Sequence, residues 1–107
     1  MRFQQQLAKE LRKMPKKISI DPKALKIRSR VELFKVIEGS KFGALIGVAQ
    51  KSRILVKDVS KFDDILKKMI IYCDHTFDSK KIIIDAPLCS KAKAKLLSEG
   101  WEVLEAG

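Results

Sequence analysis

The sequence predicts an α/β domain, with α+β as the alternative, whose centre is a mixed sheet of three to four strands. Three observations predict this fold class. The last 27 residues read as strand, helix and strand, which is the βαβ unit of two parallel strands. Two short β-compatible runs, 43–50 and 53–56, are separated by two residues and predict an antiparallel hairpin. A helical period over 61–73 supplies a helix that can pack on the sheet.

The chain of 107 residues is long enough for one domain, and 46% apolar with 34% charged residues is the composition of a globular protein. We divide it into a basic N-terminal helical arm, residues 1–17, and a single α/β domain, residues 18–107. No apolar run approaches the roughly 20 residues of a membrane span, and the N-terminus lacks the apolar stretch of a secretion signal. We therefore expect a cytoplasmic protein without a membrane span.

Residues 2–14 are expected to form the amphipathic helix of the arm. Apolar side chains recur at helical spacing and form one stripe: Phe3, Leu7, Leu11 and Met14. Pro15 ends this helix, because proline cannot continue the hydrogen-bond ladder. The flank away from the stripe carries basic and amide side chains: Arg2, Gln5, Lys9, Arg12, Lys13 and Lys16. The helix can therefore dock by its stripe and present cations on its other side.

Two start signals follow the arm. Residues 18–20 suit a short edge strand, and Asp21 before Pro22 is a helix-start pair that predicts a helical turn over 22–26. The second start is a capping box at Ser29, which predicts a helix over 30–38. Gly39 suits the position after the end of that helix. Two short helices with basic residues around the break have the outline of a helix-turn-helix, although strands are expected to follow.

The C-terminal half is expected to contain the helix over 61–73, which Ser60 and Asp63 start as a capping pair. After it come a strand, a helix and a closing strand: 81–85, 88–98 and 101–104. Three consecutive isoleucines, residues 82–84, suit an interior strand of a sheet that is covered on both faces.

Positive charge is concentrated at the N-terminus. Ten of the 23 Lys and Arg residues fall in the first 30 positions with only two acids, so this block carries +8 of the formal +10. A basic arm on a nearly neutral body is typical of a protein that binds a polyanion, nucleic acid above all. Lysine outnumbers arginine 18 to 5, which favours phosphate attraction over base reading. We predict a non-enzymatic protein that grips the phosphate backbone of DNA or RNA through Lys9, Arg12, Lys13, Lys16, Lys17, Lys23, Lys26, Arg28 and Arg30.

Two alternatives stay open. The first is a protein-interaction or regulatory module, or a homodimer, that docks through the stripe of the first helix: Phe3, Leu7, Leu11 and Met14. The second is a small metal-dependent nuclease, in which Asp85 at a strand end and Glu102 on the neighbouring strand hold a divalent cation. The second strand lacks the acid-x-Lys pattern that such a nuclease would offer.

Cys73-Asp74-His75 is the one cluster that suggests a metal or nucleophile site. The paired ligand spacing of a structural zinc site is missing, and residues two apart on a helix point in different directions. We therefore assign no metal, no cofactor and no catalytic residue, and we expect Cys73 and Cys89 to be free thiols.

Overall fold

In the computed structural model, which describes residues 5, 7–9, 12, 16–27 and 31–105, the strands form one five-stranded mixed sheet. They lie side by side in chain order: β1 (Lys16–Ile20), β2 (Val31–Glu38), β3 (Lys41–Ala49), β4 (Ser79–Asp85) and β5 (Glu102–Glu105). Neighbours among β1, β2 and β3 are antiparallel, whereas β3, β4 and β5 are parallel. The helices are the 3-10 helix η1 (Pro22–Leu25) and the α-helices α2 (Val56–Cys73) and α3 (Ser90–Ser98). The domain is thus α+β, and the three to four strands that we predicted are too few.

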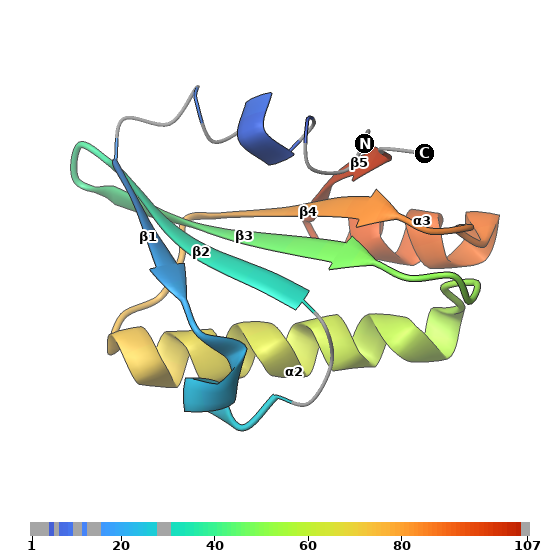
Figure 1. Cartoon of the computed structure of the whole chain (residues 1–107), viewed down its shortest axis with the longest axis horizontal. Helices are drawn as coiled ribbons and strands as arrows, with labels where there is room; N and C mark the ends of the chain where they lie inside the picture. The colour runs from blue at the N-terminus through green and yellow to red at the C-terminus, as the bar shows by residue number, and fades with distance from the viewer. Residues whose placement is uncertain (1–4, 6, 10–11, 13–15, 28–30, 106–107) are drawn as a thin grey trace.

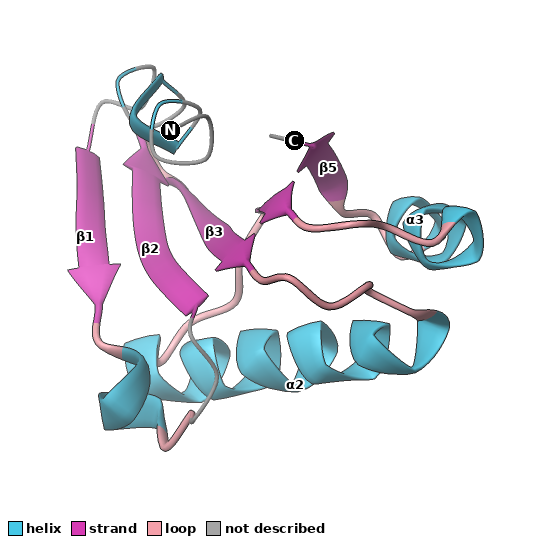
Figure 2. Ribbon diagram, turned by 45° about the vertical axis from the view of Figure 1, so that its right-hand side comes forward, coloured by secondary structure: helices cyan, strands magenta, loops and turns pink. Residues whose placement is uncertain are grey.

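The sheet is the middle layer of the molecule. Figure 1 shows α2 and α3 on one side of it and the N-terminal helical segment, whose described residues are 5, 7–9 and 12, on the other side. The view in Figure 2 agrees. The two parallel crossovers advance across the sheet in one direction, and right-handed crossovers of that kind place their helices on one face. None of the helices in the described residues is long and apolar enough to cross a membrane.

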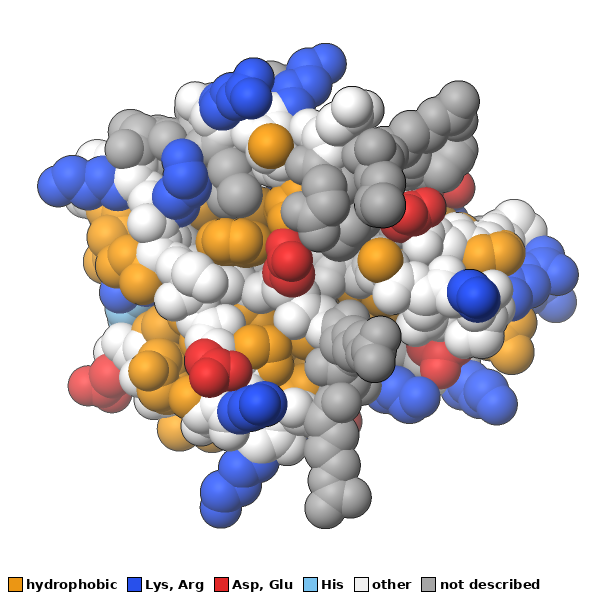
Figure 3. All heavy atoms as spheres, viewed as in Figure 1, with side chains coloured by type: hydrophobic (Ala, Val, Ile, Leu, Met, Phe, Trp, Pro, Cys, Tyr) orange, Lys and Arg blue, Asp and Glu red, His pale blue; other side chains and the backbone are white. Residues whose placement is uncertain are grey.

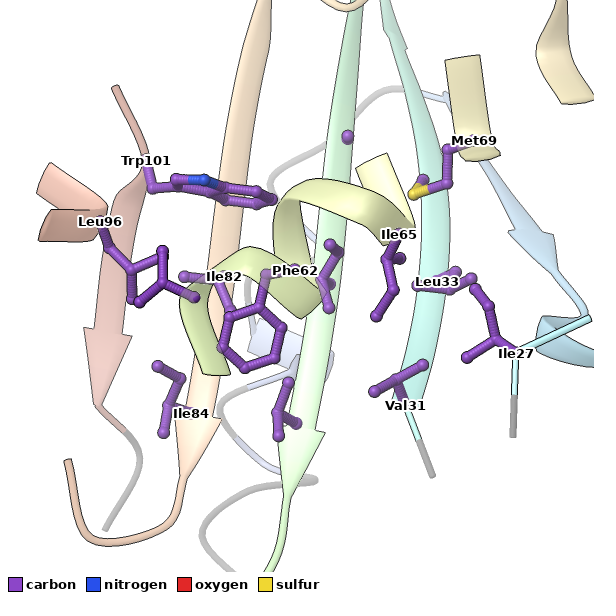
Figure 4. Packing of buried hydrophobic residues seen from close by; sticks show 14 of the residues in the cluster. Ile27, Val31, Leu33, Phe62, Ile65, Met69, Ile82, Ile84, Leu96 and Trp101 are labelled. Carbon is purple, nitrogen blue, oxygen red and sulfur yellow. The ribbon is translucent and has the colours of Figure 1, made fainter. Parts of the chain in front are cut away.

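The larger core lies between the sheet and the α2–α3 layer. Four buried side chains of α2 point toward the sheet: Val59, Phe62, Ile65 and Met69. Figure 4 shows Phe62 and Ile65 between the helix and the strands, with Trp101 at the start of β5 beside them. Each large apolar side chain buried in this way contributes roughly 1.5–3 kcal/mol. The three isoleucines of β4 are fully buried on both faces, which confirms the prediction of an interior strand.

A smaller core covers the opposite face of the sheet. Leu7 of the N-terminal helical segment is only 3% exposed and packs with Val36, Leu45 and Ile83. These three sheet residues come from β2, β3 and β4, so one helical side chain spans three strands. Phe34 and Leu104 are partly buried at the margin of this cluster. The segment therefore docks on the body of its own molecule through Leu7.

The helix predicted over 30–38 is wrong, because this segment forms β2. Val31 and Leu33 face the α2 core, whereas Val36 faces the N-terminal helical segment. A strand covered on both faces carries apolar residues on both sides, so its sequence loses the simple alternation that would have marked it. Gly39 has the left-handed φ of +61° that we expected, but it lies in the two-residue turn between β2 and β3 and not after a helix.

The hairpin predicted from 43–50 and 53–56 is also wrong. Residues 53–55 connect β3 to α2, and Ile54 makes an isolated parallel bridge with Leu88. α2 begins at Val56, five residues earlier than predicted, because Asp58 supplies the start signal: its Oδ2 accepts the backbone N–H of Leu55 at 2.8 Å. The start pair at Asp21 is confirmed, since its side chain accepts the N–H of Lys23 at the beginning of η1.

Candidate nucleic-acid interface

The N-terminal helical segment presents polar side chains on the side away from Leu7. Gln5, Lys9 and Arg12 are exposed and follow one another at i, i+4 and i+7, which places them on one helical stripe. Because Leu7 faces the sheet, this stripe faces solvent. The predicted cationic flank is therefore observed at the positions that the structure describes.

Two further lysines lie at the start of β1. As consecutive strand residues they point to opposite faces of the sheet, and Lys17, in register with Val36, points to the face that carries the N-terminal helical segment. Lys16 and Lys17 are exposed, and β1 pairs only with β2 within the described residues, so it is an edge strand of the sheet. Lys41 lies at the same end of the sheet: Lys16 pairs with Ile37, and Lys41 begins β3 on the far side of the same hairpin. Two strand spacings, about 10 Å, separate β1 from β3. We call Lys9, Arg12, Lys16, Lys17 and Lys41 the amino-terminal basic surface.

Figure 3 shows Lys and Arg side chains along the upper and left margins of the molecule, near the N-terminal helical segment and the end of the sheet where β1 starts, and others along its right and lower margins. Exposed lysines on an edge strand also oppose strand-to-strand association of two copies, so Lys16 and Lys17 protect the edge whatever else they bind.

The remaining predicted contacts do not join this surface. Lys23 and Lys26 are exposed in and after η1, beyond the opposite end of β1. Five strand residues, about 17 Å, separate them from Lys16. Lys13, Arg28 and Arg30 lie outside the described residues, as do three members of the apolar stripe: Phe3, Leu11 and Met14. Sequence reasoning missed Lys41, which a hairpin prediction at Gly39 would have placed at the same end of the sheet as the start of β1.

Two clefts open at the carboxyl ends of the parallel strands. The first has a volume of about 760 Å³ and lies between the end of β3 and the first half of α2. The second, of about 530 Å³, lies between the ends of β4 and β5. Gln50, Lys51 and Asp85 line both clefts, so the two share one rim. Carboxyl ends of parallel strands are the usual place for ligands in open α/β sheets.

The polar groups of the first cleft are positioned by short-range contacts. Asp58 accepts the Leu55 N–H and lies 3.4 Å from Lys61 Nζ, and both contacts lower the pKa of the Asp58 carboxyl group. The side-chain amide of Gln50 donates to the carbonyl oxygen of Ser52 at 3.0 Å and to its hydroxyl at 3.1 Å. These two hydrogen bonds lie within the loop that follows β3, and the Lys51 side chain of the same loop is exposed.

The carboxylate pair of the nuclease alternative is not brought together. Asp85 ends β4, whereas Glu102 begins β5 and pairs with Lys81, four residues from Asp85. The two acids are therefore separated by about 13 Å along the strands. Glu102 instead forms an ion pair of 3.3 Å with Lys81. Among the described residues, no group of three or more His, Cys, Asp and Glu side chains is arranged to hold a metal ion.

The two cysteines are free and differ in their surroundings. Cys89 precedes α3, where the backbone N–H groups of Ala92 and Lys91 stabilise its thiolate and lower its pKa. Burial raises the pKa of Cys73 at the end of α2. His75 does not form a nucleophile pair with Cys73. Its ring stacks on the ring of Phe42, with the centroids 3.9 Å apart.

A carboxyl pair joins α2 to the C-terminal end of α3. Trp101 Nε1 donates to Asp63 Oδ1 at 3.3 Å. Burial, a hydrogen bond that the protonated Glu99 carboxyl group donates to Asp63, and the negative charge of Asp63 raise the pKa of Glu99. One oxygen of Glu99 is buried without a hydrogen-bond partner in the described part of the chain. This pair is an interhelical contact and lies apart from the basic surface and the clefts.

Family models, curated proteins and solved structures give no match to this chain. Its function is therefore argued from the arrangement of its own residues.

Proposed function

We propose that this protein binds the phosphate backbone of DNA or RNA through the amino-terminal basic surface and catalyses no reaction. The observation that carries the proposal is the orientation of the N-terminal helical segment. Leu7 anchors it to the sheet, and Lys9 and Arg12 therefore face solvent, as Lys16 and Lys17 do at the start of β1. A helix held on a folded body presents its cations at fixed positions, which suits a phosphate backbone of regular spacing.

The same observation weighs against the partner-docking alternative. A helix that docks in the groove of another protein needs its apolar stripe free. Leu7 is 3% exposed, because it packs against side chains of the sheet in its own molecule. The cationic stripe, by contrast, is exposed where it is described. The separation of Asp85 from Glu102 likewise favours binding over metal-dependent cleavage.

Fluorescence anisotropy with labelled duplex DNA, single-stranded DNA and structured RNA, each across a salt series, tests the proposal and identifies the preferred polymer. If all five cations of the basic surface contact phosphates of a duplex, log Kd changes with log salt with a slope of about 4.5 in magnitude. A Lys9→Ala/Arg12→Ala variant loses two of these contacts. We expect its slope to be smaller by about 1.8 and its affinity at physiological salt to be lower.

A matched control is available on the opposite layer. Lys67 and Lys68 are exposed on α2, so Lys67→Ala/Lys68→Ala removes the same formal charge from another surface. We expect the control to keep the wild-type slope. Equal losses in the two variants would show that attraction is set by net charge alone, and the proposed surface would be rejected.

A further inference from the structure

The first cleft combines an apolar floor with a polar rim. Its floor consists of side chains from β2, β3 and α2: Val31, Val48, Phe62 and Ile65. Its rim carries two ammonium groups, Lys51 and Lys61, and two carboxylates, Asp58 and Asp85, together with Gln50 and Ser52. Asp58 is paired with Lys61. A volume of about 760 Å³ is within the range of sites for small organic ligands, and so is this division into apolar floor and few polar groups.

Asp85 is the unusual member of the rim. It is half-buried at the end of β4, and its carboxylate makes no hydrogen bond or ion pair with the residues that the structure describes. Its backbone carbonyl accepts the N–H of Gln50 at 3.2 Å, which fixes its main chain at the rim. A partly buried carboxylate without a donor is an acceptor that a ligand can satisfy.

The groups of the rim specify the chemistry of the ligand. The floor suits a flat, weakly polar ring system. The Asp85 carboxylate accepts hydrogen bonds from N–H or O–H donors, and the Lys51 ammonium group attracts an anion. We propose that the first cleft binds a guanine nucleotide. Its base lies on the apolar floor, its two adjacent N–H donors meet both oxygens of Asp85, and its phosphate lies at Lys51. Guanine is favoured over the other bases because only its pairing edge offers two neighbouring donors to a carboxylate.

The second cleft is lined by as many carboxylates as the first. It shares Lys51 with the first cleft, but it adds the carboxylate of Glu105, which already pairs with Lys93 at 2.8 Å. The first cleft likewise adds the carboxylate of Asp58, which pairs with Lys61 at 3.4 Å. The phosphate is therefore placed at Lys51, which both clefts share, and the apolar floor that receives the base distinguishes the first cleft.

Titration of the full chain with GMP, followed by amide NMR signals, tests this site. We expect shifts at residues 48–52 and at Asp85, weaker binding of AMP, and no comparable shifts with inorganic phosphate alone. Asp85→Asn keeps the shape of the side chain and removes its charge. It should weaken GMP at least about tenfold and remove the preference over AMP. Lys51→Ala should weaken GMP and leave the affinity for guanosine unchanged.

The control is Lys57→Ala, which removes an exposed cation of α2 that does not line the cleft, and it should bind GMP like the wild type. The absence of shifts at residues 48–52 with millimolar GMP would overturn the proposal, and so would equal affinity for AMP and GMP. A native NMR spectrum of unliganded Asp85→Asn ensures that a loss of binding is not a loss of fold.

The nucleotide can be free or can be the end of a strand. Comparison of GMP with short oligonucleotides that end in G at the 3′ or the 5′ end distinguishes these sources, since a terminal site gains affinity from the added nucleotides and a site for free nucleotide does not. The inference is independent of the proposed function. Lys9→Ala/Arg12→Ala should retain GMP binding, and Asp85→Asn should retain the salt-dependent binding of duplex, so failure of one leaves the other standing.

Discussion

Replacement of Leu7 with alanine tests whether the N-terminal helical segment belongs to the folded body. Leu7 is 3% exposed, and its neighbours Val36, Leu45 and Ile83 are at most 3% exposed, so the change leaves a cavity between the segment and three strands. Buried leucine-to-alanine changes cost about 2–5 kcal/mol. The segment can partly settle into the cavity, so we expect a loss of about 3 kcal/mol in the free energy of unfolding, or about 12 °C in Tm.

Urea denaturation followed by far-ultraviolet circular dichroism measures this loss. The matched control is Leu97→Ala on α3, where the side chain is 52% exposed and should contribute less than about 0.5 kcal/mol. If Leu7→Ala is as stable as Leu97→Ala, the segment is not anchored by Leu7. The apolar stripe would then be free for a partner, and the reasoning that orients Lys9 and Arg12 would be refuted.

Three further predictions concern single sites. In urea denaturation, Glu99→Gln should be more stable than the wild type at pH 7, and this difference in stability should vanish below the ordinary Glu pKa of about 4.3. The reason is that the raised pKa of Glu99 makes folding favour its protonated form, so the wild type loses stability as pH rises through the folded pKa. A difference that does not depend on pH would contradict the carboxyl pair with Asp63. Alkylation by iodoacetamide, measured by mass spectrometry, should be faster at Cys89 than at Cys73 and should begin at lower pH, and equal rates would contradict the opposite pKa shifts. Gly39→Ala should lower the free energy of unfolding by about 1–2 kcal/mol, because a Cβ there meets no atom within 4 Å and the cost comes from the φ of +61° alone; an unchanged stability would contradict the turn geometry.

The sequence predicted those elements whose signals are local. β4, α3 and β5 agree with their predictions to within about two residues, because each has a short apolar pattern bounded by a proline, a glycine or a turn. β2 was predicted as a helix because its apolar pattern depends on its neighbours in the sheet and not on nearby residues in the sequence. It lies between β1 and β3 in a sheet covered on both faces, and only that neighbourhood explains apolar side chains at both odd and even positions.

The candidate sites show the same division. The cationic flank at Lys9 and Arg12 followed from helical spacing and was found where the structure describes it. Lys41 joins that surface through strand register, which was missed because Gly39 was read as the end of a helix and not as the turn of a hairpin. The first cleft could not be predicted from the sequence for a further reason. Lys51 and Ser52 were read as the turn of a hairpin that does not exist, whereas they follow β3 at the carboxyl edge of the sheet.

The two proposed sites lie at opposite ends of β3, and this sets a length for any strand that uses both. Lys41 begins β3 and the rim of the first cleft follows its end, nine strand residues later, a distance of about 30 Å. In a duplex that carries an unpaired terminal guanine, phosphates of one strand follow one another every 3.4 Å along the axis, so about nine nucleotides of duplex span it. A nucleic acid whose terminal guanine occupies the cleft can reach the basic surface only beyond that length. Affinity for duplexes with an unpaired terminal G should therefore rise steeply near nine base pairs, because the second contact becomes intramolecular. Asp85→Asn should abolish the step and leave the gradual salt-dependent rise that the basic surface produces alone.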